Sequence, residues 1–337
     1  MHVIIDTDAG VDDSLAIVYA ANSSELQIEM LTTVSGNVPV REVTQNVLLL
    51  KDFLQLKAPV FSGAEVPRVR KLVTAPEVHG EDGVGGYRIL HNISKNDWET
   101  GEAANKIVEA ARRLRNKLTI ISIGPMTNIA KAVSIDAEAM RAAGNIIQMG
   151  GVFFGYGNTT TFTEFNIFVD PDAADFVLNE GVRVKFVPLD VTEKLFMPRT
   201  IITSLFNSSK GMDSNLKKLL KQATDYYILY HRVTEKLDGC YLHDPITIAA
   251  AVNPKWFKFV DSFVSVETKG DHTAGMTLAD FRKRKQKGNS EVAVSFDAEK
   301  FLLDFTKKVF GVKISSSVIR KNCLRDRNYP EFSNILE

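Results

Sequence analysis

The most constraining feature of this chain is an acidic turn near its start, in the stretch VIIDTDAGVDDSL at residues 3–15. The apolar residues 3–5 predict a short buried strand, Gly10 permits a tight turn, and the apolar pattern from Leu15 predicts a helix. Four aspartates fall in this segment: Asp6, Asp8, Asp12 and Asp13. Their carboxylates repel one another, and a helix N-terminus offsets only ~0.3–1 kcal/mol per acid. The rest requires a cation, and oxygen ligands favour a hard one such as Ca²⁺ or Mg²⁺.

Other interpretations of this turn explain less. A capped surface helix needs one aspartate rather than four. An EF-hand loop that starts at Asp6 requires glycine at its sixth position and an acid at its twelfth, where this chain has Val11 and Ile17. An aspartyl-phosphate phosphatase also has Asp-x-Asp after a strand, with the first aspartate as nucleophile. That class usually has threonine soon after the second aspartate and a later Gly-Asp after an apolar strand. Here Ala9 follows Asp8, and Gly270-Asp271 lies in a polar stretch, so the phosphatase is kept as a second enzyme hypothesis.

Composition excludes several classes of protein. The 337 residues include 41 Lys plus Arg and 41 Asp plus Glu, so net charge indicates neither a nucleic acid nor an acidic membrane as partner. The two cysteines, Cys240 and Cys323, form no metal spacing and no disulfide framework, which is typical of a reducing compartment. We find no signal-peptide pattern and no apolar run long enough to span a membrane, and we expect a cytoplasmic protein.

The order of the expected elements predicts the fold class. Apolar strands alternate with helices up to about residue 190, and this βαβα order favours a Rossmann-like, mostly parallel sheet with helices on both faces. We expect one domain over residues 1–337, with the core sheet in about 1–190 and a helical cap with closing strands and a helix in about 191–337. Ligands bind at the carboxyl ends of strands in such sheets, and the acidic turn lies at one of these ends.

Several segments outside the acidic turn bear on this prediction. The Gly-rich residues 65–87 predict a long loop, for which a lid is one explanation. In the later part we expect helices around 225–233 and through 252, a strand pair around 257–266 and 291–296, and a helix that Asp297 caps. The basic residues 282–287 (RKRKQK) are interpreted as a solvated loop rather than a nucleic-acid contact.

Three polar segments are candidates for a binding site. NTTTFTEFN, residues 158–166, offers amides and an acid around an aromatic residue and would suit a polyol, although an ordinary polar loop is the simpler explanation taken alone. His243-Asp244-Pro245 opens a helix, and an aspartate N-cap followed by proline explains the Asp alone. His79 lies in the long loop, where a lone histidine is more often merely solvated.

Taken together, these motifs resemble the inosine-uridine nucleoside hydrolase family over roughly residues 2–310. The Asp-x-Asp-x-Gly-x-Asp-Asp signature starts at Asp6, and the other pieces follow in the family's order. These pieces are Thr32–Asn37 (TTVSGN), His79–Gly83 (HGEDG), Gly124–Asn128 (GPMTN), Met149–Gly151, Glu164–Asn166 and His243–Pro245. Ala9 is a small departure, because many members have Pro or Gly there.

The resemblance implies a site and a chemistry. It implies Ca²⁺ held by Asp8, Asp13, Asp244 and the backbone carbonyl of Thr127, with Asp8 deprotonating the attacking water. The residues that it implies for substrate binding are Asp12, Asn37, Asn158, Glu164 and Asn166 at the sugar hydroxyls, Met149 and Phe165 as an apolar floor, and His79. His243 would donate a proton to the departing base. The implied substrate is a ribonucleoside of the uridine or inosine class, and members are commonly homodimers or homotetramers.

The preferred base and the occurrence of turnover stay open at this stage. A histidine at position 243 goes with the broad or pyrimidine-tolerant group of the family. The aromatic residues of the preceding helix either line the base pocket or form a core stripe; they are Tyr226, Tyr227, Tyr230 and His231. A protein that binds nucleosides without cleaving them is a further alternative.

Overall fold

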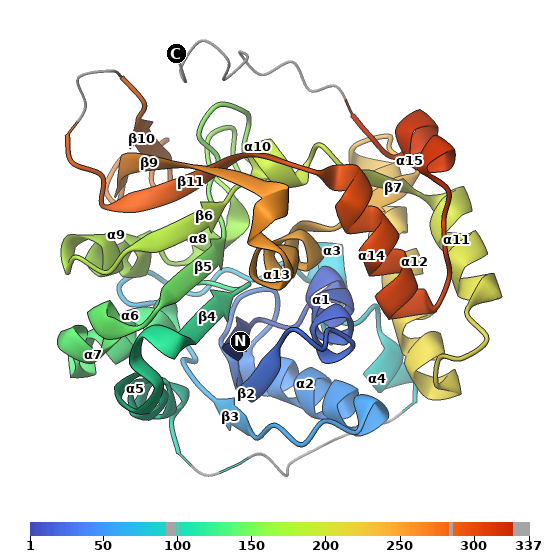
Figure 1. The fold of residues 1–337 in the computed structure, drawn as a ribbon, viewed down its shortest axis with the longest axis horizontal. Helices are drawn as coiled ribbons and strands as arrows, with labels where there is room; N and C mark the ends of the chain where they lie inside the picture. Colours follow the sequence, from blue (N-terminus) through green and yellow to red (C-terminus); the bar gives the residue numbers. More distant parts are fainter. Residues whose placement is uncertain (92–98, 100, 283–285, 326–337) are drawn as a thin grey trace.

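The protein is built on a nine-stranded sheet with helices on both of its faces (Figure 1). The computed structural model describes residues 1–91, 99, 101–282 and 286–325, so residues 283–285 of the basic run lie outside the described part. The strand order is β10-β9-β11-β6-β5-β4-β1-β2-β3. The strands are β1 (His2–Thr7), β2 (Gln27–Thr33), β3 (Val60–Ser62), β4 (Leu118–Ser122), β5 (Asn145–Met149), β6 (Val184–Val187), β9 (Phe257–Val266), β10 (Thr277–Asp280) and β11 (Ser290–Phe296). A separate two-stranded sheet pairs β7 (Phe196–Pro198) with β8 (Gly239–Tyr241).

The expected fold class is confirmed by the strand pairing. β9 runs antiparallel to both β10 and β11, whereas the other pairs of the main sheet are parallel. β11 pairs with β6, so the late strands continue the same sheet that the first half of the chain begins. β1 lies between β2 and β4, with Asp6 level with Thr32 and Ser122, so Asp8 follows directly at the carboxyl edge.

Alternation along the strands divides the apolar core between the two faces. In β1, Val3 and Ile5 belong to one core cluster and Ile4 to the other, because successive side chains of a strand point to opposite faces. Figure 1 shows the two helical layers. One face is covered by α5 (Ala103–Leu114), α6 (Thr127–Ile135), α7 (Ala137–Ala142) and α9 (Pro171–Asn179). The other face is covered by α1 (Val11–Ala21), α2 (Val40–Leu54), α13 (His243–Val252) and α14 (Ala298–Phe310).

The remaining helices lie around the carboxyl edge of the sheet or at its periphery. They are α3 (Pro76–His79), α4 (Tyr87–Leu90), α8 (Phe165–Val169), α10 (Leu189–Thr192), α11 (Arg199–Ser208), α12 (Ser214–Thr234) and α15 (Ser316–Asn322), with 3₁₀ turns at Arg115–Lys117 and Pro254–Trp256. Within the described residues, no helix is both long and apolar enough to cross a membrane.

Several sequence-based element predictions are confirmed and others fall short. The strand pair β9–β11 and the helix after Asp297 are present, and the Asp297 side chain accepts a hydrogen bond from the Lys300 backbone N–H. The helix predicted at 225–233 is much longer, because α12 begins at Ser214, where Asp213 caps it. The loop at 65–87 contains α3, and α4 begins at Tyr87, while α11 and β10 were not predicted.

Candidate active site

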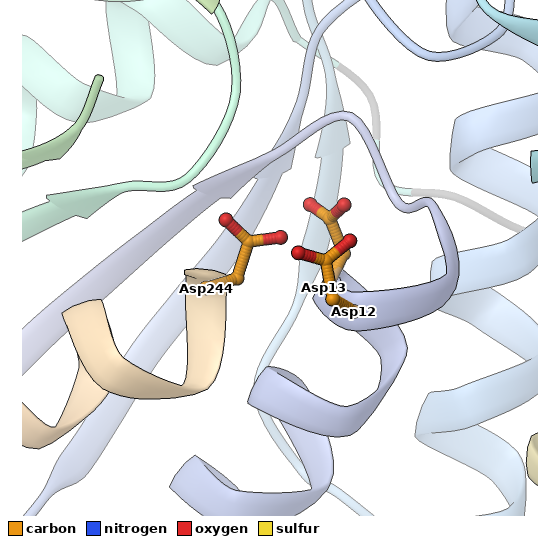
Figure 2. A group of neighbouring side chains, drawn as sticks. All are labelled: Asp12, Asp13 and Asp244. Carbon is orange, nitrogen blue, oxygen red and sulfur yellow. The ribbon is translucent and has the colours of Figure 1, made fainter. Parts of the chain in front are cut away.

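Three carboxylates meet where two helices begin, as Figure 2 shows. Asp12 and Asp13 lie in the first turn of α1, and Asp244 lies in the first turn of α13. Each residue offers one oxygen, and these oxygens lie within 4.8 Å of one another. All three residues are buried, and the positive ends of both helix dipoles face the cluster. Residues from distant parts of the sequence thus form one buried acidic group.

The turn before α1 fixes the orientation of Asp13. The Thr7 hydroxyl donates to Asp13 Oδ1 at 2.5 Å, and the Gly10 backbone N–H donates to Asp13 Oδ2 at 2.9 Å. Ala9 has φ +35°, which is unusual for a residue with a side chain. A Cβ at Gly10 would lie only 2.6 Å from the Asn37 amide nitrogen and 2.7 Å from His79 Nδ1. Glycine at position 10 therefore lets Asn37 and His79 close over the turn.

Asp8 lies beside this cluster and is incompletely hydrogen-bonded. Its Oδ2 accepts the Asn37 backbone N–H at 2.8 Å, and a Cβ at Gly36 would collide with that oxygen. Its Oδ1 is buried and has no hydrogen-bond partner among the described residues. Asn37 also donates from its side-chain nitrogen to Asp13 Oδ2 at 3.2 Å. Asn37 therefore links Asp8 to Asp13.

Asp6, the fourth acid of the N-terminal segment, has different partners. Its Oδ1 accepts from Thr32 Oγ1 at 2.6 Å and from Asn128 Nδ2 at 2.7 Å. Burial raises its pKa to about 7, against the lowering effect of these two donors. Asp6 thus joins β1 to β2 and α6. The fourth member of the acidic group, beside Asp8, Asp12 and Asp13, is Asp244 and not Asp6.

Burial and mutual repulsion disfavour the ionised form of the four clustered acids. Desolvation is the main cause of the raised pKa values of Asp8, Asp12, Asp13 and Asp244, and for Asp12 the pKa is about 7. The charge of Asp13 raises the pKa of Asp8 and Asp12 further, and the charge of Asp12 does the same for Asp244. Within the described part of the chain, no lysine or arginine forms an ion pair with these acids.

This arrangement suits a metal ion. Clustered carboxylate oxygens are the ligands that hard divalent cations prefer, and the unpartnered Asp8 Oδ1 is an additional acceptor beside the triad. The buried acids can therefore hold a metal. Thr127, whose carbonyl the family resemblance implies as a ligand, is buried at the first position of α6, and its hydroxyl donates to Asp170 Oδ2 at 2.6 Å.

A pocket opens beside the acidic cluster and brings most of the predicted site residues together. The predicted residues that line it are Asp12, Asn37, His79, Met149, Asn158, Glu164, Phe165, Asn166, His243 and Asp244. Asp8, Asp13 and Thr127 do not line it, and all three are buried. The predicted metal ligands and the predicted substrate contacts thus meet at Asp244 and Asp12.

His79 is buried rather than solvated. Its Nδ1 accepts the Val11 backbone N–H at 3.1 Å, and its ring stacks on Tyr227 with centroids 5.7 Å apart. Burial, with a smaller contribution from the charge of His231, lowers its pKa to about 3. The ring is therefore neutral near pH 7, with its proton on Nε2, so His79 can offer a hydrogen-bond donor.

His243 is held on two sides. Its Nδ1 lies 2.7 Å from the Thr192 hydroxyl, and its ring stacks on Tyr241 with centroids 5.3 Å apart. The residue lies at the start of α13, directly before Asp244. A proton donor at this position would act beside the acidic cluster.

The segment 158–166 is tied to the carboxyl end of β5. Glu164 caps α8 and accepts backbone N–H groups of Gly151, Asn166 and Ile167 at 3.1, 2.8 and 3.1 Å. The Asn166 amide nitrogen donates to the Met149 carbonyl at 3.1 Å, so its amide oxygen is the atom offered to a ligand. Asn158 Oδ1 accepts the Phe165 backbone N–H at 3.0 Å.

Comparison with known proteins decides the family. The sequence model of the inosine-uridine preferring nucleoside hydrolases matches residues 3–303. The chain belongs to this family. An inosine-uridine preferring nucleoside hydrolase of Crithidia fasciculata is 33% identical over 304 residues, which cover 89% of this chain and 94% of that protein. A pyrimidine-specific ribonucleoside hydrolase of Salmonella paratyphi C is 34% identical over 306 residues, which cover 90% of this chain and 96% of the relative.

Solved structures agree with this assignment. A plant nucleoside hydrolase and a purine-preferring ribonucleoside hydrolase from Gardnerella vaginalis each superpose with a TM-score of 0.83 at 30% identity. Each covers 92% of this chain, and the chain covers 99% and 98% of them. The chain is therefore a nucleoside hydrolase, a glycosylase that acts on N-glycosyl compounds.

Helix α12 supplies the nucleoside hydrolase with an aromatic wall. Tyr227, Tyr230 and His231 line the pocket, whereas the Tyr226 hydroxyl donates to the Pro76 carbonyl at 3.2 Å. Glu193, Glu235 and Tyr241 line the pocket too and were not predicted. For Glu235 a signal was present, because it follows His231 by four positions and therefore lies on the same face of the helix.

Proposed function

We propose that this nucleoside hydrolase cleaves the N-glycosidic bond of ribonucleosides of the uridine and inosine class, releasing free base and ribose. The observation that carries the proposal is the buried cluster of Asp12, Asp13 and Asp244 beside a pocket that His243 lines. The proposed metal is Ca²⁺, with Asp8, Asp13, Asp244 and the Thr127 carbonyl as ligands, because Ca²⁺ accepts several oxygens in irregular geometry. When bound, such an ion supplies positive charge that orients a water molecule and a sugar diol.

Each of the proposed site residues has a role in this reaction. Asp8 accepts a proton from the attacking water, whose oxygen bonds to the sugar carbon as the bond to the base breaks. The reaction passes through an oxocarbenium-like sugar, and the neighbouring carboxylates stabilise its positive charge. Asp12, Asn37, Asn158, Glu164 and Asn166 hold the sugar hydroxyls over Met149 and Phe165. His243 donates a proton to the departing base, and His79 offers its Nε2–H to the substrate.

Release of ribose tests the reaction. The purified protein with added Ca²⁺ is expected to release reducing sugar from uridine or inosine, whereas 2′-deoxyuridine is expected to react poorly because the diol is incomplete. Binding of nucleoside without sugar release would favour the non-catalytic binding protein, and phosphate release from a sugar phosphate would favour the phosphatase. No sugar release from any ribonucleoside would refute the proposal.

The role of His243 has a test of its own. His243→Ala is expected to lower kcat on natural nucleosides by about 10²–10⁴-fold, the usual contribution of one general acid. Nitrophenyl riboside is expected to be spared, because its leaving group needs no proton. Equal losses on both substrates would show that His243 does not act as the acid.

The preferred base and the assembly are parts of the same proposal. We expect a substrate panel of purine and pyrimidine ribosides to include both uridine and inosine among those cleaved. We also expect one domain over the whole chain, a cytoplasmic location, and a homodimer or homotetramer, which light scattering would detect.

A further inference from the structure

Helix α10 contacts two parts of the proposed site, the backbone that precedes the segment 158–166 and helix α13, which begins with His243. It spans Leu189–Thr192, directly after β6, and its residues are buried. It contacts both α13 and β11. Its second residue, Asp190, and its last, Thr192, form hydrogen bonds with different parts of the site.

Asp190 fixes the backbone that leads into the sugar-binding segment. Its Oδ2 accepts the Phe153 N–H at 2.7 Å, and its Oδ1 accepts the N–H groups of Phe154 and Gly155, each at 2.9 Å. Charge-assisted bonds of this kind are among the stronger hydrogen bonds in proteins. They anchor the chain three residues before Asn158, the first proposed sugar contact of the segment 158–166.

Thr192 fixes the proposed proton donor. Its side chain is fully buried, and its Oγ1 lies 2.7 Å from His243 Nδ1. Tyr241 stacks on the same imidazole at an interplanar angle of 28°. The stacking restricts tilting of the ring, and the bond to Thr192 disfavours a 180° flip about the Cβ–Cγ bond, which would replace Nδ1 by a carbon atom.

We propose that Thr192 is a positioning residue for His243, and that α10 aligns the two halves of the site, the sugar loop through Asp190 and the proton donor through Thr192. The inference rests on the proposed function, because it assigns His243 a role in base departure. A hydroxyl can donate to or accept from Nδ1. The bond to Nδ1 therefore persists whether or not Nδ1 carries a proton, and Nε2 is the nitrogen that donates the proton to the departing nucleobase.

The chemistry of the side chain at position 192 gives a matched set of variants. Thr192→Val keeps the shape and removes the hydroxyl, whereas Thr192→Ser keeps the hydroxyl and removes a methyl group. Misplacement of a catalytic group by about 1 Å can cost about 100-fold. We expect Thr192→Val to lower kcat on uridine and inosine by about 10–100-fold and to leave nitrophenyl riboside within about 3-fold. Thr192→Ser is expected to restore most of the loss.

Asp190→Asn gives the contrasting result. Because Asp190 acts on the sugar loop, this variant is expected to raise KM by a similar factor for natural and activated ribosides, since all of them carry the same sugar. Thr306→Val is the control for loss of a buried threonine hydroxyl, because Thr306 is fully buried in α14 and donates to the Leu303 carbonyl. Its kinetics are expected to match the wild type, and its thermal unfolding gives the general stability cost.

Kinetics and crystal structures of the variants together decide the inference. An unchanged ratio of nitrophenyl riboside to uridine rates in Thr192→Val would overturn it, as would failure of Thr192→Ser to recover the natural substrates. If the wild type cleaves no ribonucleoside, the proposed function fails, and crystal structures of the variants then decide the positioning role alone. A His243 ring that leaves its wild-type rotamer in Thr192→Val but not in Thr192→Ser supports the role, and an unmoved ring in Thr192→Val refutes it.

Discussion

Glu164 makes the stability of this nucleoside hydrolase depend on pH in a way that one substitution isolates. The residue is only 2% exposed, and burial raises the pKa of its carboxyl from 4.5 to about 7, against three backbone N–H groups that lower it. Below about pH 4.5 the group is protonated in both the folded and the unfolded chain. Between about pH 4.5 and about pH 7 it ionises only in the unfolded chain, so ionisation favours unfolding, and above about pH 7 it is ionised in both states. The difference corresponds to about 3 kcal/mol, lost by the folded state as the pH rises between these values.

Glu164→Gln removes this ionisation. The substitution has its own constant cost, because an amide hydrogen replaces one acceptor of the α8 cap. The free energy of unfolding of the wild type, measured relative to Glu164→Gln, is therefore expected to fall by about 2–3 kcal/mol between about pH 5 and about pH 8.

Urea unfolding at the two pH values, with equal Ca²⁺ in all samples, measures the difference. The other buried acids titrate in both proteins, so their contributions cancel in the comparison. Glu138→Gln, at an exposed position of α7, is the matched control and is expected to give the same difference at both pH values. An unfolding free-energy difference between wild type and Glu164→Gln that does not change with pH would refute the reasoning.

The remaining predictions concern the metal, the general base Asp8 and the loop that carries His79. Asp8→Ala is expected to lower kcat by at least about 10²–10⁴-fold in the ribose-release assay, because it removes the proposed base and a proposed ligand. A chelator is expected to lower the melting temperature, and identical melting curves with and without chelator would argue against a bound ion. Ca²⁺ at about 100 times its Kd is expected to add about 2.7 kcal/mol to the free energy of unfolding of the wild type but much less to that of Asp244→Asn. Arg88→Met is expected to cost about 2–4 kcal/mol in urea unfolding and to raise KM, because the buried guanidinium donates to Asn46, Gln45 and Glu42; an unchanged KM would separate this network from the site.

The sequence predicted the acidic turn well because its signals are local. A strand, a glycine turn and a helix start are each encoded within a few residues, and Asp8, Asp12 and Asp13 lie where this pattern places them. Asp244 comes from a distant helix, and only the resemblance to a family connected it with the first three. Asp6 could not be separated from the other acids by composition, because its partners Thr32 and Asn128 come from other elements.

The rest of the pocket depends on packing that local patterns do not encode. Tyr226 and Tyr227 are neighbours in sequence, yet one donates to the Pro76 carbonyl and the other lines the pocket. Their roles depend on the rotation of α12 about its axis, which α3 helps to set by contact. His79 looked solvated in a Gly-rich loop, but it is buried because its Nδ1 reaches the Val11 N–H. Thr192 carries no sequence signal, since a single threonine becomes informative only beside His243.

The meeting of α1 and α13 bears on how the protein would acquire the proposed ion. The acids that these helices carry come from opposite ends of the fold's first 250 or so residues, so a nascent or partly unfolded chain has no assembled place for a divalent cation. Binding of the proposed ion would therefore be coupled to folding. Once bound, the ion would link helix α1 to helix α13. Depletion of the ion in a cell would then shorten the lifetime of the enzyme against proteases as well as stop its turnover.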